Sequence, residues 1–209
     1  MKKFINVIFS IIFSVFIIST IVKFTVGFKQ LYYFDIEYLS IPILSGLSKE
    51  DIKKNYDYMI DYNLDKDKKE FELPSIKSSD NGKIHFEEVR NIFQILNKIF
   101  YISLLASIIS LAINILNKNI EVLKTTSKTL ILIPLILMLP IVVNFEGTFV
   151  LFHNIMFNND YWIFDPNLDP VINILPQEFF FHAGMMILIL IIIASLTNYL
   201  IYRLLKREQ

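Results

Sequence analysis

The sequence contains no cysteine. This absence excludes disulfides, thiolate zinc sites, iron-sulfur clusters, a thiol nucleophile and a lipid-anchoring cysteine on the chain itself. The sequence also lacks the G-x-x-x-x-G-K-[ST] phosphate loop, the H-E-x-x-H zinc motif and the G-x-S-x-G turn of serine hydrolases. Its formal net charge is zero, which gives no indication of a nucleic-acid partner. Any chemistry should therefore proceed without cysteine and without a bound nucleotide.

Long hydrophobic runs are abundant instead. The hydrophobic content is 54% and the mean hydropathy is +0.51, values typical of membrane proteins. A spanning helix needs about 20 mostly apolar residues, and four segments qualify: residues 5–28, 92–116, 129–149 and 179–205. These segments predict four transmembrane helices.

Two of these segments need comment. Pro134, Pro140 and Asn144 interrupt the third, which predicts a kinked helix packed inside the bundle. The first could be mistaken for a cleavable signal peptide. Its apolar region is longer than the usual 7 to 15 residues and no A-x-A site follows, so a retained anchor is favoured.

Basic residues predict the orientation. They cluster before the first span, between the second and third, and at the end of the last: Lys2, Lys3, Lys118, Lys124, Lys128, Arg203, Lys206 and Arg207. The positive-inside rule places these clusters, the loop 117–128 and both termini in the cytoplasm. The segment 150–178 has no lysine or arginine and should be extracytoplasmic. Span parity puts 29–91 on that side too, so we expect a multi-pass protein of the cell membrane.

The first external segment, residues 29–91, has the composition of a soluble region. Ser48 is a good N-cap for a helix over residues 49–62. Two alternating runs around Asp80-Asn81-Gly82 predict a β-hairpin, with His85 on its second strand or just beyond it. The predicted fold is thus an α-helical membrane protein with four spans and an extracytoplasmic α+β cap, forming one folded unit rather than two domains.

The chain has three histidines, His85, His153 and His182, all in or beside the external segments. Three histidines can form a catalytic zinc site, but no two share a helical face at i, i+4, so no metal is expected. The alternative for each is an ordinary interfacial histidine. Similarly, Trp162 and the aromatic run 179–181 are typical of a belt at the headgroup level.

Two motifs resemble a known family. "HFEEVRNIF" begins at His85, and "FHNIMFNNDYWIFDPNLDPVINILPQEFF" covers residues 152–180. Together they resemble the bacterial lipoprotein intramolecular transacylases, a family of four-span membrane proteins. The positions that match in the second motif are Phe152, His153, Ile155, Trp162, Phe164, Asp165 and Asp169. Asn158 and Phe180 depart from the pattern, where glycine and tryptophan would be expected, and these changes concern loop shape more than chemistry.

The resemblance implies a reaction and its residues. The substrate would be a lipoprotein whose N-terminal cysteine carries a thioether-linked diacylglyceryl group. The enzyme would move the sn-2 acyl chain to that cysteine's α-amino group and leave an N-acyl lyso-form lipoprotein. His85 and His153 correspond to the catalytic histidines, and nothing in the resemblance assigns a role to His182. Membrane lipid would be a further partner, with no cofactor and no nucleic acid.

Further residues are candidates for orienting the substrate, an imidazole or the oxyanion: Arg90, Asn154, Trp162, Asp165 and Asp169. Their alternative roles are structural: turn formation for the aspartates, belt packing for Trp162, and an ion pair with Glu87 or Glu88 for Arg90. Two other functions stay open at this point. One is a non-enzymatic membrane scaffold or sensor, and the other is a zinc-dependent membrane hydrolase.

Overall fold

The computed structural model describes residues 2–65 and 70–208, without the side chains of residues 2, 137 and 138. The chain forms two compact units rather than the single unit predicted. Unit 1 comprises Met1–Thr25, Leu96–Val143 and Gly184–Gln209, and unit 2 comprises Val26–Ile95 and Asn144–Ala183. Each is described separately below.

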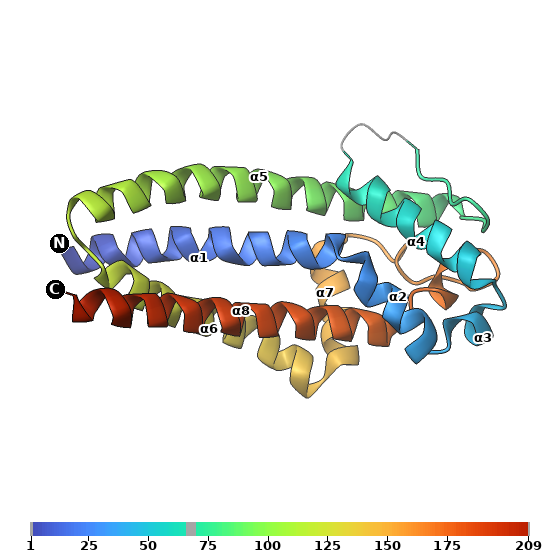
Figure 1. The fold of residues 1–209 in the computed structure, drawn as a ribbon. Helices are drawn as coiled ribbons and strands as arrows, with labels where there is room; N and C mark the ends of the chain where they lie inside the picture. Colours follow the sequence, from blue (N-terminus) through green and yellow to red (C-terminus); the bar gives the residue numbers. More distant parts are fainter. Residues whose placement is uncertain (1, 66–69, 209) are drawn as a thin grey trace. The chain divides into compact units, whose positions relative to one another are not determined.

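Unit 1 is built from parts of four helices: α1 (Lys2–Gly27), α5 (Asp80–Leu116), α6 (Glu121–Val143) and α8 (Gln177–Arg207). Within the unit these helices lie side by side, and the start of α1, the end of α8 and the α5–α6 connection lie at the same end (Figure 1). Among the described residues, α1, α5 and α8 are long and apolar enough to cross a membrane. They contain three of the predicted spans.

The remaining predicted span, residues 129–149, is not one helix. α6 ends at Val143 and α7 (Phe145–Met156) begins after Asn144, whose side chain accepts a hydrogen bond from the Gly147 amide at 3.0 Å. The apolar run continues through this point, but the asparagine caps a new helix and interrupts the old one. The predicted loop 117–128 is also too long, because α6 already begins at Glu121.

Pro134 and Pro140 both lie inside α6. The expectation that it packs inside a bundle is wrong for its second half, where large apolar side chains are exposed: Leu135, Ile136, Leu139, Val142 and Val143. Such side chains suit a lipid environment, in which burial against protein is not required.

The interior of unit 1 is lined by small polar side chains that connect the helices. Ser10 on α1 donates to the Val122 carbonyl at 3.1 Å, and Ser195 on α8 donates to the Ser127 carbonyl at 2.7 Å. Small residues let helices approach closely, and their hydroxyls have no other partner in lipid. Hydrogen bonds from small polar side chains to backbone carbonyls therefore help to join the helices of unit 1.

Unit 2 contains α2 (Lys29–Tyr38), α3 (Ile41–Ser45), α4 (Lys49–Leu64), α7, the 3₁₀ helix η1 (Pro170–Asn173) and the first turns of α5 and α8. The prediction of α4 is confirmed. Ser48 accepts a hydrogen bond from the Asp51 amide at 3.1 Å, and Ile52 and Tyr56 are buried on one face. This face joins an apolar core shared by the helices and the loop segments between them: Tyr32, Ile36, Ile41, Ile52, Tyr56, Met59, Tyr62, Phe71, Leu73, Phe86, Val171, Ile174 and Phe179.

The predicted β-hairpin is absent from the described residues. Asp80 opens α5, so His85 lies on a helix; Lys69, at the start of the predicted first strand, lies outside the described residues. Ser79 caps this helix, since its hydroxyl accepts from the Gly82 amide at 3.0 Å. Asp169 in turn accepts from the Ser79 amide and hydroxyl at 2.7 and 2.6 Å. A β-carbon on Gly82 would lie 2.3 Å from the Asp169 carboxylate, so glycine serves this close approach and not a turn.

Candidate active site

His85 and His153 lie close together in unit 2, with 6.0 Å between their ring centroids and 31° between their planes. His85 sits in the second turn of α5 and is 5% exposed, and His153 lies in the last turn of α7. Residues 68 positions apart in the sequence thus form one pair of imidazoles. This pairing is the central feature of the site.

Aromatic rings surround both imidazoles. The ring centroid of Phe157 lies 4.7 Å from that of His85 and 5.6 Å from that of His153. Phe164 packs edge-on against His85 with 5.5 Å between ring centroids, and the Phe149 centroid lies 4.2 Å from that of His153. The motif of residues 152–180 therefore supplies much of the apolar wall around its own His153 and around His85 of α5.

A backbone hydrogen bond fixes the tautomer of His153. Its Nδ1 lies 2.7 Å from the carbonyl oxygen of Phe149. A carbonyl can only accept, so neutral His153 carries its proton on Nδ1 and keeps the lone pair on Nε2. His85 differs, because its buried Nδ1 has no hydrogen-bond partner among the described residues. The pair thus offers one fixed base and one imidazole with an unused nitrogen.

Burial keeps both imidazoles neutral. His85 precedes the apolar part of α5 and is followed closely by Glu87 and Glu88, so it lies outside the spanning portion. Burial, and then the neighbouring His153, lowers the pKa of His85 to about 4. Burial also lowers the pKa of His153, although the bond to the Phe149 carbonyl opposes this shift. Both imidazoles are therefore uncharged at neutral pH, each with one N–H.

Trp162 completes the group. Its ring lies 4.6 Å from the His153 ring, and its indole Nε1 is buried without a hydrogen-bond partner among the described residues. An indole N–H can only donate, and leaving it unpaired in a buried position costs free energy. A buried, unsatisfied donor beside a base is well suited to a substrate oxygen.

The other predicted residues lie in different places. Asn154 is exposed on α7, and Asp165 accepts from the Asn167 amide at 2.8 Å, which is a turn-forming role. The guanidinium of Arg90 stacks 5.0 Å from the Tyr62 ring. Asp169 contacts Ser79 rather than an imidazole, and so it anchors the helix start that carries His85.

Two contacts were not anticipated from the sequence. Asn159 donates to Glu88 at 2.8 Å, which ties the motif after α7 to α5 one turn from His85. Asp35, with 0% exposure, binds His182 Nδ1 through Oδ1 at 2.9 Å. Burial raises the pKa of Asp35, and the bond to His182 counteracts this. In the sequence, this pair could have been suspected from Asp35, an acidic residue between the apolar side chains of Tyr32 and Ile36 on one face of α2.

Metal ligands do not gather in the parts of the chain that the structure describes: no three His, Asp or Glu side chains there lie where they could hold one ion.

Comparisons with known proteins give the family. The family model described as lipoprotein intramolecular transacylase Lit matches residues 7–180. The structure of the membrane-integral lipoprotein intramolecular transacylase Lit from Bacillus cereus is similar, with a TM-score of 0.95 and 39% identity over 100% of this chain and 97% of that one. Structures of that protein with an H85R and an H85A mutation each give a TM-score of 0.91 at 38% identity, covering all of this chain and 93% and 94% of theirs. No curated protein matches the chain. Because the family model matches most of the chain and the likeness extends along its whole length, the chain belongs to the Lit family of membrane-integral acyltransferases.

Proposed function

We propose that this protein moves the sn-2 acyl chain of an S-diacylglyceryl-cysteine to the α-amino group of the same cysteine, with His153 as general base. The observation that carries the proposal is the His85–His153 pair, in which His153 has its proton fixed on Nδ1. Family membership supports the reaction class, and the pair supports the acid-base chemistry.

The amine and the base are matched. An α-amine has a reference pKa of about 7.7 to 8 and a histidine one of about 6.5. A neutral amine attacks the ester carbonyl, a C–N bond forms, and His153 Nε2 takes the proton from nitrogen. The same imidazolium then protonates the glycerol oxygen as the C–O bond breaks. Such proton transfers typically contribute about 10² to 10⁴ in rate.

His85 and Trp162 supply hydrogen bonds in this scheme. Because His85 is neutral, it polarises the ester carbonyl by donating one N–H. Trp162 donates its unpaired Nε1–H to the oxyanion of the tetrahedral intermediate. Asp169 acts indirectly by holding the start of α5, and Arg90, Asn154 and Asp165 contribute to substrate placement or loop shape.

The site is proposed to face the extracytoplasmic side, with both termini in the cytoplasm. The Lys and Arg clusters lie at the start of α1, at the end of α8 and in and after the α5–α6 connection. These segments lie at the same end of unit 1, as the positive-inside rule requires (Figure 1). Since the chain has no cysteine, Lys118→Cys and Asn158→Cys each create a unique thiol. A membrane-impermeant maleimide should label only Asn158→Cys in intact cells. The reverse labelling contradicts this orientation.

Fragment-ion mass spectrometry tests the reaction. A diacylated lipopeptide with a free amine is incubated with the purified protein, and its intact mass should stay constant while the N-terminal fragment gains one acyl group. An N-acetylated lipopeptide is the matched control and should not change. Both His85→Ala and His153→Ala should abolish the shift.

The same experiment separates the rival functions. A zinc-dependent hydrolase would release free fatty acid, lower the intact mass and lose activity with a chelator. A scaffold or sensor would leave the lipopeptide unchanged although the protein is folded. Either result rejects the transacylase mechanism proposed here.

A further inference from the structure

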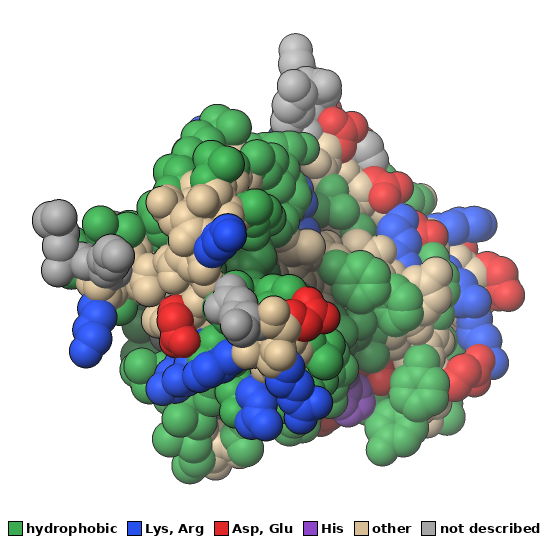
Figure 2. Space-filling view, turned by 60° about the vertical axis from the view of Figure 1, so that its left-hand side comes forward, with side chains coloured by type: hydrophobic (Ala, Val, Ile, Leu, Met, Phe, Trp, Pro, Cys, Tyr) green, Lys and Arg blue, Asp and Glu red, His purple; other side chains and the backbone are tan. Residues whose placement is uncertain are grey.

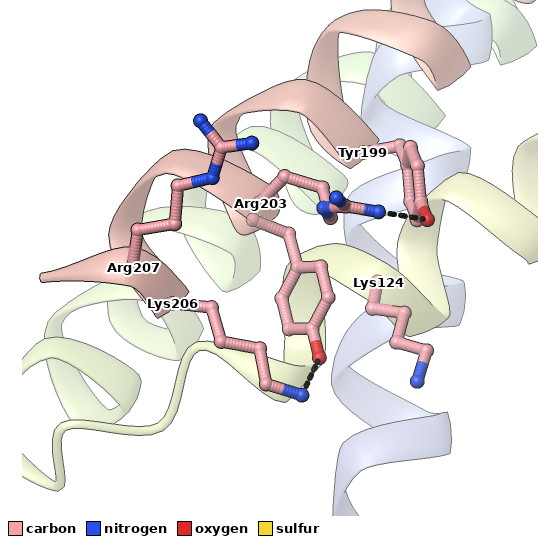
Figure 3. Close-up of a pocket in the computed structure, with 6 residues that line it drawn as sticks. Lys124, Tyr199, Arg203, Lys206 and Arg207 are labelled. Atoms are coloured by element: carbon pink, nitrogen blue, oxygen red, sulfur yellow. Dashed lines mark hydrogen bonds between the residues drawn. The ribbon is translucent and has the colours of Figure 1, made fainter. Parts of the chain in front are cut away.

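A second cluster of polar side chains lies in unit 1, and the acyl-transfer chemistry does not use it. A cavity of about 360 Å³ is lined by Lys124 of α6 and by Tyr199, Tyr202, Arg203, Lys206 and Arg207 of α8 (Figure 3). This volume falls within the range of small-molecule sites, about 300 to 1,000 Å³. Four of its six lining residues are cations.

Tyrosines hold two of these cations in place. Arg203 donates to the Tyr199 hydroxyl at 3.4 Å and Lys206 donates to the Tyr202 hydroxyl at 3.1 Å, as Figure 3 shows. Tyr202 is 2% exposed, and its hydroxyl in turn donates to Glu121 at 2.9 Å. The ammonium groups of Lys124 and Lys206 each lie 5.5 Å from the Tyr202 ring centroid. A buried tyrosine therefore organises positive charges around the cavity.

The cluster has an excess of positive charge. Glu121 is the acid bonded to this network, and it is bonded through Tyr202. Among the described residues, none of the four cations forms an ion pair within 4.0 Å. Four cations that outnumber the neighbouring Glu121 carboxylate create a favourable potential for an anion.

The cavity lies beside apolar surface. On α8 the neighbouring side chains Leu200, Leu204 and Leu205 are exposed, and this helix is apolar enough to span a membrane. Figure 2 shows Lys and Arg side chains gathered at this end of unit 1 with hydrophobic side chains next to them. An anion bound here would sit where a charged headgroup meets the acyl region of a bilayer.

We propose that this cavity binds the phosphate of an anionic phospholipid headgroup, with the acyl chains lying along the apolar side chains of α8. The Arg203 guanidinium offers the planar pair of donors that suits phosphate oxygens, and Lys124, Lys206 and Arg207 add charge around it. The alternative is that these cations only attract an anionic surface and fix the orientation, without a specific site.

Native mass spectrometry of the full-length protein in a nonionic detergent tests the site. Phosphatidylglycerol and phosphatidylcholine are titrated against the wild type, an Arg203→Gln/Lys206→Gln variant and a control Lys3→Gln/Lys118→Gln variant. The control removes two exposed cations from the same end of unit 1, neither of which lines the cavity. The apparent affinity for phosphatidylglycerol should fall about tenfold or more in the cavity variant, because charge-assisted hydrogen bonds are lost, and should stay near wild type in the control.

The other outcomes overturn the proposal. Equal losses in both variants would show general surface attraction, and equal binding of phosphatidylcholine would show that charge is irrelevant. If sn-glycerol 3-phosphate alone competed at the same concentration as the lipid, the site would be one for soluble phosphates. Arg203→Lys keeps the charge but removes the paired donors, so it should weaken phosphatidylglycerol binding with no change in the melting temperature.

Discussion

The two units of the molecule bury opposite kinds of side chain. In unit 2 the fully buried residues are mainly apolar, and Tyr32, Ile36 and Ile52 lie at its centre. In unit 1 the buried set is dominated by small polar residues: Ser10, Ser14, Ser19, Ser107, Ser110, Asn114, Thr126, Ser127, Ser195 and Asn198. Unit 1 turns its polar side chains inward and its apolar ones outward, as a lipid solvent favours, and unit 2 buries apolar side chains as a water-soluble domain does.

The largest expected effect is on the transacylation rate, and it distinguishes His153 from His182 within unit 2. His153→Gln removes the proposed base and should lower the transacylation rate by about 10² to 10⁴. His182→Gln keeps a hydrogen-bond donor for the buried Asp35 and should retain most of the wild-type rate. Initial rates on a fluorescent lipopeptide compare the two variants. Equal losses would mean that the assignment of His153 as base is wrong.

The next effect compares a core position of unit 2 with an exposed apolar position of unit 1. Ile52 is 0% exposed in unit 2 and Ile136 is 67% exposed in unit 1. Ile52→Ala should destabilise the protein by about 2 to 5 kcal/mol through lost contacts and a cavity. Ile136→Ala should change stability by about 0.5 kcal/mol or less. Denaturant unfolding followed by circular dichroism measures both, and a large loss in Ile136→Ala would contradict a lipid-facing position.

The pH dependence of the rate tests the neutral imidazoles. Both histidines have lowered pKa values, that of His85 about 4, so the base form exists throughout the neutral range. Below about 7.7 the substrate amine becomes protonated, and kcat/KM should fall tenfold for each pH unit. An analogue with a less basic amine should move this limb to lower pH. A limb near pH 6.5 that ignores the substrate would contradict the prediction.

Two glycine substitutions test how tightly Asp169 packs against Gly82 at the start of α5. Gly82→Ala places a methyl group against the Asp169 carboxylate and should destabilise unit 2 by about 1 to 3 kcal/mol. Gly27 has no atom within 4 Å of the added carbon, so Gly27→Ala should be neutral or slightly stabilising. Melting temperatures distinguish them, and identical values would show that the contact is easily displaced.

The smallest effect concerns the polar interior of unit 1. Ser195→Ala removes the bond to the Ser127 carbonyl between α8 and α6 and should cost about 0.6 kcal/mol. Thr197→Ala removes a bond to Ile193 within α8 on the exposed side and should have no measurable effect on helix association. Refolding equilibria in mixed micelles resolve such differences. A larger loss in Thr197→Ala would reverse the expected order.

Sequence reasoning succeeded where local signals decide the structure. Ser48 and the apolar positions of α4 lie within one segment, so the helix and its cap were predictable. The turn signal at Asp80-Asn81-Gly82 failed because a residue far along the chain, Asp169, stabilises a helix start there. The prediction of one span over residues 129–149 was wrong for a similar reason, since Asn144 caps a new helix within a continuous apolar run.

The proximity of two histidines in the candidate site could be predicted from the sequence. The two motifs indicated His85 and His153, and the structure brings them together. The tautomer of His153 was not predictable, because it depends on a backbone carbonyl one turn away in a helix that was predicted as part of a span and a loop. Nor did any motif show that Trp162 would have a buried, unpaired N–H.

The bond from His153 to the Phe149 carbonyl has an energetic consequence for the membrane setting. A base that exchanges protons through a single nitrogen can pass to the glycerol oxygen the proton that it takes from the neutral amine, so the proposed acyl shift from that amine consumes and releases no further proton. Such a cycle requires no link to the ion gradient across the bilayer, because the only other proton is the one that an ammonium substrate loses to water before it reacts. The enzyme would therefore work equally well in energised and de-energised membranes.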